Sequence, residues 1–280
     1  ALSRPKELAD ILEGHAQRPR PRLRWIDHYD AELRAHDKRL RAAMAVAPTD
    51  HILDIGCGTG QTTRDAARAA TLGSALGVDI SDAMLERARS SSSTEGVHNI
   101  AFEHGDAQTH PFPDARFDLI VSRFGTMFFA DPAAAFSHLA CAARPGARLA
   151  MLVWQREEQN EWATAIRRVL PGGDEPTASG VDAFSLADPD LVRSILGAAG
   201  FVDIDIRDVR EPVYYGPDAA TAIDLVLDMP KPRQRLARLD ADAAERALGT
   251  LREMLLAHQT AEGVLFDSRA WLVTARRTRA

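Results

Sequence analysis

Residues 51–60 read HILDIGCGTG, a short apolar run that ends in three closely spaced glycines. The apolar run predicts a buried strand, and the glycines predict a tight turn before a helix. Such a turn lets backbone approach a ligand closely, because glycine adopts backbone angles that are closed to other residues. About 20 residues later, a second apolar run, LGVDI, ends at Asp79 and Ile80. A carboxylate at that strand tip can accept both hydroxyls of a ribose, so the two segments predict a nucleoside-binding site.

The sequence departs from the dinucleotide-binding fingerprint at two positions, and both departures limit which nucleoside ligand can bind. The fingerprint has the spacing G-x-G-x-x-G, whereas Gln61 here takes the place of the last glycine. Asp54 lies two residues before the first glycine, where a carboxylate repels a diphosphate and suits a cation. We therefore expect a cationic nucleoside ligand, and an NAD-dependent oxidoreductase has only fold analogy in its favour.

Residues 54–60 resemble the first motif of class I S-adenosylmethionine-dependent methyltransferases. Residues 99–107 are similar to the third strand of that family and its following acid, 112–122 to its fourth strand, and 142–149 to its turn into the fifth strand. The resemblance covers roughly residues 50–155, and it is greatest to small-molecule enzymes such as the methyltransferases of ubiquinone and menaquinone biosynthesis. It implies an α/β, Rossmann-like fold with a seven-stranded, mostly parallel sheet, an antiparallel last strand, helices on both faces and a helical cap insertion.

The resemblance also implies which residues contact S-adenosylmethionine. Asp54 would lie near the ammonium of the cofactor, Asp79 would hold the ribose hydroxyls, and Asp106 would accept from the adenine amino group. Asp106 could instead cap a turn or helix, and Gln61 could either donate to the cofactor's carboxylate or face solvent. Tyr29 comes from a leading helix, where it either closes over the cofactor or packs in the core, as does Trp25. The full implied set is Asp54, Gly56, Gly58, Gly60, Gln61, Asp79, Ile80, Asp106, Ala107, Ser122, Arg123, Phe124 and Tyr29.

The segment after the expected fourth strand bears on the methyl acceptor. It reads SRFG at residues 122–125, and it lacks the Asn or Asp-Pro-Pro-aromatic turn of enzymes that methylate base amines or glutamine amides. The apolar side chains of Phe124, residues 127–129 and Trp154 could form a wall for a sulfonium and a flat acceptor; the other interpretation of residues 127–129 is helix packing. No catalytic base is assigned, and the histidine spacings match no metal site.

Composition narrows the functional classes further. The chain has 280 residues, of which 45% are hydrophobic and 26% charged, and a net charge of -6. This is typical of a globular protein and disfavours nucleic acid as a partner. The sequence shows neither an apolar run of about 20 residues nor a secretory apolar core, so we expect a cytoplasmic protein. The two cysteines, Cys57 and Cys141, predict neither a disulfide framework nor a metal centre. The oligomeric state stays open between monomer and homodimer.

The periodicity of apolar residues, together with the positions of glycine and proline, predicts the order of the helices and strands. We expect an N-terminal helical segment at 1–48 and a methyltransferase domain at 49–280, with helical cap insertions at about 156–199 and 211–263. The expected strands are 51–55, 74–79, 99–104, 117–122, 147–154, 201–206 and 264–275, and the expected helices are 5–17, 25–47, 61–70, 82–90, 132–143, 160–170, 188–199 and a section at 218–262 broken at Pro230 and Pro232. Residues 90–93, four serines, are expected to be a polar break after a helix.

The expected function is S-adenosylmethionine-dependent methyl transfer to an oxygen, nitrogen or carbon nucleophile of a small hydrophobic metabolite. The alternative is a regulatory or catalytically inactive protein that keeps the cofactor site. The two differ in whether an apolar acceptor cavity adjoins the sulfonium.

Overall fold

The structure, a computed structural model, describes residues 28–170 and 182–279 and divides into two compact units. The sheet unit comprises the described residues within 35–159, 176–211 and 269–280. The helical unit comprises those within 1–34, 160–175 and 212–268. The expected helix at 5–17, Trp25 and the start of the expected helix at 25–47 lie outside the described residues.

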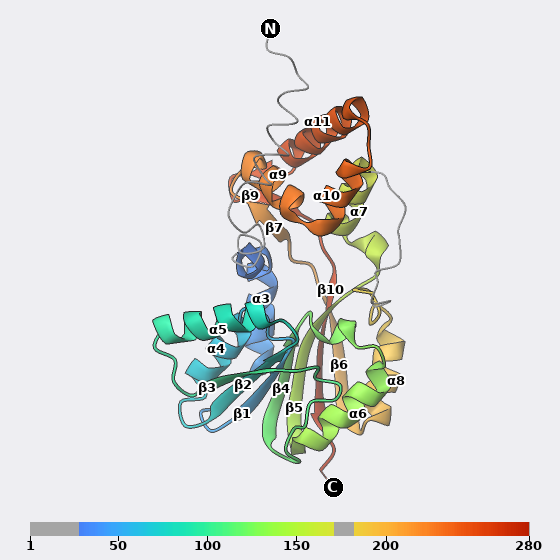
Figure 1. Ribbon diagram of the computed structural model, residues 1–280. Coiled ribbons are helices and arrows are strands. Elements are labelled where there is room, and N and C mark those ends of the chain that lie inside the picture. The colour runs from blue at the N-terminus through green and yellow to red at the C-terminus, as the bar shows by residue number, and fades with distance from the viewer. Residues whose placement is uncertain (1–27, 171–181, 280) are drawn as a thin grey trace. The chain divides into compact units, whose positions relative to one another are not determined.

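The sheet unit is built on seven strands in the order β3-β2-β1-β4-β5-β10-β6 (Figure 1). Neighbouring strands from β3 to β5 pair in parallel, and β10 is antiparallel to both β5 and β6. This confirms the expected fold class. The strands are β1 His51–Ile55, β2 Ser74–Asp79, β3 Ile100–His104, β4 Phe117–Arg123, β5 Ala143–Trp154, β6 Phe201–Val209 and β10 Ala270–Arg277.

Helices cover both faces of this sheet (Figure 1). On one face, α4 (Gln61–Ala69) and α5 (Asp82–Thr94) pack against β1, β2 and β3. On the other, α6 (Pro132–Ala142) packs on β5 and α8 (Pro189–Ala198) on β6. Helix α3 (Arg34–Met44) precedes β1, and short 3-10 helices occupy Thr126–Phe128 and Glu157–Gln159. Because both faces are covered, the central strands are buried along nearly their whole length, as HILDI and FDLIVSR illustrate.

Side-chain caps fix two of these helices where the sequence predicts them. Ser81 accepts a hydrogen bond from the Met84 amide at 3.4 Å, and Asp131 accepts one from Ala134 at 3.0 Å with Pro132 at the first helical position. The expected polar break at residues 90–93 is wrong, because these serines lie within α5. The Ser92 hydroxyl donates to the Ala88 carbonyl at 2.8 Å, so the helix itself satisfies a buried serine.

The helical unit contains several helices and a small sheet of order β7-β9-β8 within its described residues. These elements are α7 Glu161–Val169, β7 Val213–Gly216, α9 Ala219–Asp228, α10 Pro230–Ala237, α11 Ala241–Ala257, β8 Gln259–Thr260 and β9 Gly263–Phe266. The break expected at Pro230 is present, since this proline opens α10, but the one expected at Pro232 is wrong, because residue 232 lies within that helix. A single last strand at 264–275 is wrong: β9 joins the small sheet and β10 the large one.

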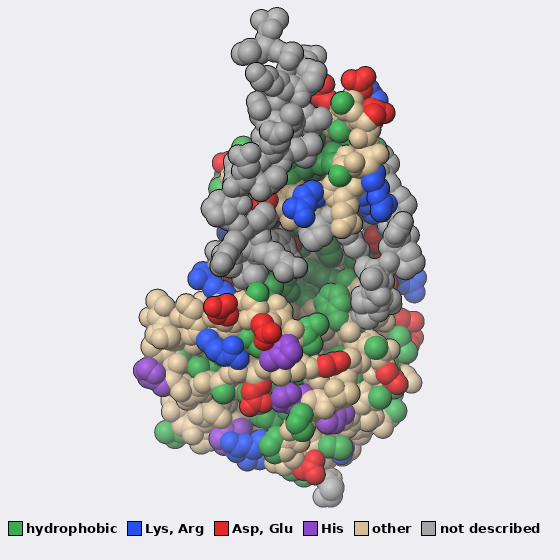
Figure 2. Space-filling model, in the orientation of Figure 1, with side chains coloured by type: hydrophobic (Ala, Val, Ile, Leu, Met, Phe, Trp, Pro, Cys, Tyr) green, Lys and Arg blue, Asp and Glu red, His purple; other side chains and the backbone are tan. Residues whose placement is uncertain are grey.

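On the face that Figure 2 shows, the surface of the sheet unit has no single chemical character: acidic, basic and histidine side chains are interspersed among apolar ones. Within residues 28–170 and 182–279, no helix combines the length and the apolar character that crossing a membrane requires.

Candidate functional site

The turn between β1 and α4 forms the floor of the site. Gly56, Gly58 and Gly60 have φ angles of +64°, +53° and +75°, the left-handed region that favours glycine. The amides of Gly56 and Cys57 donate to the Val78 carbonyl at 2.9 and 3.1 Å, which fastens the turn to β2. A Cβ atom on Gly60 would lie 2.7 Å from the Phe102 ring. The glycines therefore satisfy both a backbone conformation and a tight packing requirement.

Asp79 links this turn to the start of the next helix. It ends β2, and its carboxylate accepts hydrogen bonds from the Gly58 amide at 2.8 Å and the Ser81 amide at 2.9 Å. A carboxylate has about four acceptor sites, so these two bonds orient the group and leave others for a ligand. Ile80 beside it is 71% exposed, so its side chain is open to contact with a ligand.

Asp54 lies in β1 directly before the glycine turn and is only 1% exposed. One carboxylate oxygen accepts from the Thr63 hydroxyl at 2.6 Å, and the other, Oδ1, has no hydrogen-bond partner. Burial raises the pKa of Asp54 to about 7, although the Thr63 hydrogen bond and the charge of Arg123 act in the opposite direction. A buried acceptor without a donor is costly, and a positively charged ligand near the turn would stabilise its ionised form.

Asp106 and Ala107 follow β3. The Asp106 carboxylate accepts from the Gln108 amide at 3.0 Å and from the Gln108 side chain at 3.0 and 3.1 Å. This is the turn cap that the sequence left open as one of two roles. Asp106 is exposed and Ala107 is buried, so the contact of Asp106 with adenine stays a prediction.

The side chains at the end of β4 are engaged inside the sheet unit. Ser122 is fully buried; its hydroxyl donates to the Ile55 carbonyl at 2.8 Å and accepts from the Gly125 amide at 3.2 Å. Phe124, with a left-handed φ of +58°, stacks on Trp154 at a ring distance of 3.9 Å. At both Ser122 and Phe124, the hydrogen bonds and packing leave the backbone as the part that can face a ligand.

The apolar side chains at residues 127–129 differ in how far they are buried. Met127 and Phe129 are 1% and 7% exposed, and Phe129 packs edge-on against Phe136, which favours the packing role for both. Phe128 is 52% exposed. Phe128 is thus the member of this group that is open to solvent.

His36 and Asp37 belong to the site's surroundings and were missed by the sequence reasoning. Both are buried on α3, and His36 lies edge-on to the Phe124 and Trp154 rings at 5.5 and 5.3 Å. Burial, helped by the nearby charge of Arg123, lowers the pKa of His36 to about 3, so this imidazole is neutral at physiological pH. The signal was present, because positions 33, 36, 37, 40 and 44 follow the helical period of the buried face.

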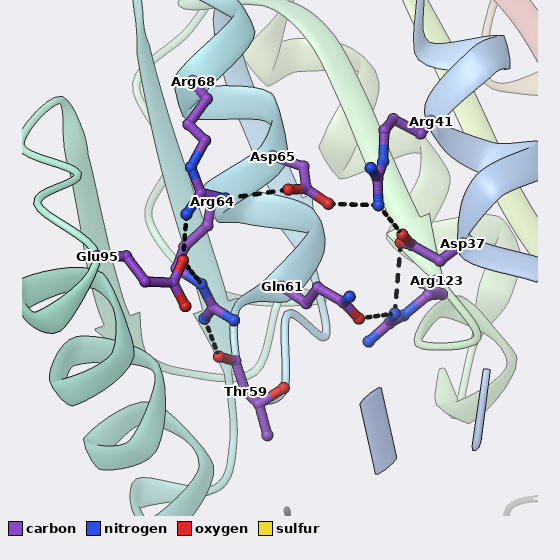
Figure 3. Close-up of polar contacts among 9 residues, drawn as sticks. All are labelled: Asp37, Arg41, Thr59, Gln61, Arg64, Asp65, Arg68, Glu95 and Arg123. Carbon is purple, nitrogen blue, oxygen red and sulfur yellow. Dashed lines mark hydrogen bonds and ion pairs between the residues drawn. The ribbon is translucent and has the colours of Figure 1, made fainter. Parts of the chain in front are cut away.

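Asp37 opens a chain of alternating charges that reaches the glycine turn (Figure 3). The Arg123 guanidinium donates to the Gln61 side-chain oxygen at 2.6 Å and to Asp37 at 3.4 Å. Arg41 pairs with both Asp37 and Asp65. From the other end, Arg64 donates to the Thr59 carbonyl at 2.6 Å and pairs with Glu95 at 3.1 Å; Arg68 connects Asp65 to Glu95. Gln61 is therefore held by Arg123.

Tyr29 and three histidines are the remaining candidates. Tyr29 belongs to the helical unit and is half-buried, so its closure over the cofactor stays a prediction. His104, His110 and His138 each have a hydrogen-bond partner, the Ile80 carbonyl, Glu103 and the His110 carbonyl respectively. Among the described residues, no group of three or more histidine, cysteine or acidic side chains could hold a metal ion.

Comparison with known proteins finds a family model that matches part of the chain. Residues 52–146 match the family described as a methyltransferase domain. An uncharacterized protein of Mycobacterium tuberculosis is 30% identical over 118 residues, which are 42% of this chain and 42% of that protein. The chain thus spans less than half the length of this relative.

Two further comparisons cover more of the chain. A demethylmenaquinone methyltransferase of Thermus thermophilus is 29% identical over 187 residues, 62% of this chain and 83% of that protein. The crystal structure of the YcgJ protein of Bacillus subtilis superposes with a TM-score of 0.61 at 19% identity, covering 88% of this chain and 99% of that one. This last likeness concerns the fold alone.

Proposed function

We propose that this protein transfers the methyl group of S-adenosylmethionine to a small hydrophobic molecule, because residues 52–146 match a methyltransferase domain and a demethylmenaquinone methyltransferase is among the relatives. One observation carries the proposal. Three left-handed glycines, of which Gly58 donates to the Asp79 carboxylate, follow a buried Asp54 whose Oδ1 atom has no partner. Such a site combines a cradle for close backbone approach, a ribose acceptor and a negative charge, which a cationic nucleoside needs.

The residues present fit the cofactor along its whole length. Asp79 and the exposed Ile80 lie at the end of β2, on the side of β1 toward β3, and suit the adenosine part. Arg123 ends β4, on the other side of β1, and its guanidinium donates to the Gln61 side chain, so this pair suits the amino acid part. The proposed contacts are Asp54, Gly56, Gly58, Gly60, Gln61, Asp79, Ile80, Asp106 and Ala107, the backbone of Ser122, Arg123 and Phe124, and Tyr29.

Positioning is the main contribution that the chain makes to the reaction. S-adenosylmethionine supplies a methyl group on a sulfonium, which is already a good leaving group. Holding a nucleophile in line and about 3 to 3.5 Å from the methyl carbon can lower the barrier by several kcal/mol. The hydrogen-bonded glycine turn is a rigid support for this task. Burial lowers the pKa of His36 to about 3, too low for an effective general base, and no other side chain is assigned that role.

The acceptor is proposed as an oxygen, nitrogen or carbon nucleophile on a small hydrophobic molecule. The Thermus relative, which is named for methylation of demethylmenaquinone, supports this class. The 52% exposure of Phe128, after β4, adds an apolar contact point in the sheet unit.

The proposal is tested in two steps. Calorimetry should detect binding of S-adenosylmethionine and S-adenosylhomocysteine and clearly weaker binding of NAD; equal or tighter binding of NAD would overturn the cofactor assignment. The protein is then incubated with methyl-labelled cofactor and small-molecule extracts, and labelled products are identified by mass spectrometry. Cofactor binding without labelled product from any extract would favour the non-catalytic alternative.

A further inference from the structure

The buried pair Asp37 and Arg123 has no evident structural necessity. The two side chains are 4% and 5% exposed. Burying an ion pair gains little stability, because desolvation of both charges offsets their attraction. Arg123 is also the last residue of β4, directly beside the glycine turn in the sheet order. We therefore look for the role of this ion pair in the neighbouring side chain that it orients.

What it orients is Gln61, the first residue of α4. Arg123 donates to the Gln61 side-chain oxygen at 2.6 Å. Because that oxygen is occupied, the amide nitrogen of the same side chain, which can only donate, faces away from the guanidinium (Figure 3). Gly60, which precedes α4, has no side chain that could cap the helix. The first backbone amides of α4 are therefore further hydrogen-bond donors at the same end of the helix.

Donors of this kind favour the negatively charged end of a ligand. Adenosine is proposed on the β2 side of the turn, where Asp79 lies, so the amino acid end extends to the β4 side. Its carboxylate is the one anionic group of S-adenosylmethionine. We propose that Asp37 is a positioning residue for this carboxylate: it holds Arg123, and Arg123 turns the Gln61 amide toward the cofactor. This inference rests on the proposed function.

Two ligands separate positioning from general structural support. S-adenosylhomocysteine has the amino acid end, whereas 5′-methylthioadenosine has the same nucleoside and sulfur without it. Asp37→Asn keeps the shape of the side chain and removes its charge. We expect this change to weaken binding of S-adenosylhomocysteine about tenfold, the effect of one charge-assisted hydrogen bond, and to leave binding of 5′-methylthioadenosine unchanged. Equal weakening of both ligands would overturn the proposal.

Two further variants complete the test. Gln61→Ala should reduce the preference for S-adenosylhomocysteine by a similar factor, and Asp37→Asn should add nothing in that background. If Gln61→Ala leaves the preference intact, the inference is wrong, whatever the folding of the Asp37 variant. Glu95→Gln is the matched control, because Glu95 is 37% exposed at the far end of the same network and should leave the preference unchanged. If the unaltered protein binds neither ligand, the proposed function itself fails.

Discussion

At the scale of single residues, hydrogen bonds and packing within the chain already hold the candidate site residues in place. Asp79 is the main example, because two backbone amides hold its carboxylate at the strand tip. Gly60 is another, since its backbone angle and its neighbours both exclude a side chain. His36 and Asp37 show the limit of sequence reasoning at this scale. Their period on the helix predicts burial, but only the fold brings Arg123 and the Phe124 ring against them.

Asp79→Ala should weaken binding of S-adenosylmethionine, because the variant removes the acceptor proposed for the ribose hydroxyls. The expected loss is about tenfold to a hundredfold in affinity, from about 1.5 to 3 kcal/mol for hydrogen bonds to a charged group. Calorimetry measures it, with circular dichroism to check the fold. Asp82→Ala is the control, since Asp82 is exposed three residues further on. Normal binding by a folded Asp79→Ala protein would remove Asp79 from the site.

Gly60→Ala should destabilise the sheet unit more than Gly96→Ala does. Both glycines have a positive φ, +75° and +66°, so both substitutions carry similar backbone strain. Only at Gly60 does the new Cβ collide, 2.7 Å from the Phe102 ring and 2.9 Å from the Ala88 Cβ atom. Overpacking of this kind costs about 1 to 3 kcal/mol. Denaturant titration gives the two free energies of unfolding, and equal values would show that Phe102 moves aside without cost.

At the scale of elements, the alternation of strand and helix from β1 to β5 was predictable, because each strand is a short apolar run next to a clear turn or cap. The failures have physical reasons. Residues 264–275 are apolar on both sides of Asp267, so the pattern could not separate β9 from β10. The serines at 90–93 continue α5, where the hydroxyls of Ser92 and the following Thr94 donate to carbonyls of the preceding turn. The strand β7 was missed because four residues show too little alternation.

The contact between α11 and α7 should be sensitive to pH. His258 ends α11 and shares a hydrogen bond of 2.9 Å with Glu161 at the start of α7. Burial alone would lower the pKa of His258, but the hydrogen bonds with Glu161 and Met254 raise it above 6.5. Burial alone would raise the pKa of Glu161, but the hydrogen bonds from His258 and the Asp267 amide hold it below 4.5. Both groups are therefore charged in the folded state between pH 4.5 and 6.5.

A raised histidine pKa stabilises the fold below pH 6.5, and this contribution is lost as pH rises through the folded-state pKa. A lowered glutamate pKa stabilises it above pH 4.5, and this contribution is lost as pH falls. Glu161→Gln should thus lower the free energy of unfolding most near pH 5.5, by about 0.5 to 1 kcal/mol for so exposed a pair. Melting curves at several pH values measure it against Glu262→Gln, an exposed change in the same unit. A constant difference up to pH 9 would exclude the ion pair as the cause.

At the scale of the whole molecule, the cofactor site and the helical unit are separable in the sequence. The proposed cofactor residues belong to the sheet unit, with the exception of Tyr29. The sequence could predict these residues because a glycine turn and strand-end acids are local features. It could not locate the acceptor site: Met127, Phe129 and Trp154 look like a wall in the sequence, yet they are buried in packing. We therefore assign acceptor recognition to the helical unit as a prediction.

Replacing residues 217–262 by a short turn should abolish methyl transfer while cofactor affinity changes little. The deletion removes α9, α10 and α11 but keeps β7 and β9, which pair antiparallel with Gly216 opposite Val264, so a tight turn can rejoin them. Labelled-cofactor assays measure transfer, and calorimetry with S-adenosylhomocysteine shows whether the sheet unit is intact. If the shortened protein folds and still methylates its substrate at the normal rate, the helices do not select the acceptor. Tyr29 would then be the next residue to change, because the leading helix is the remaining candidate for covering the reaction.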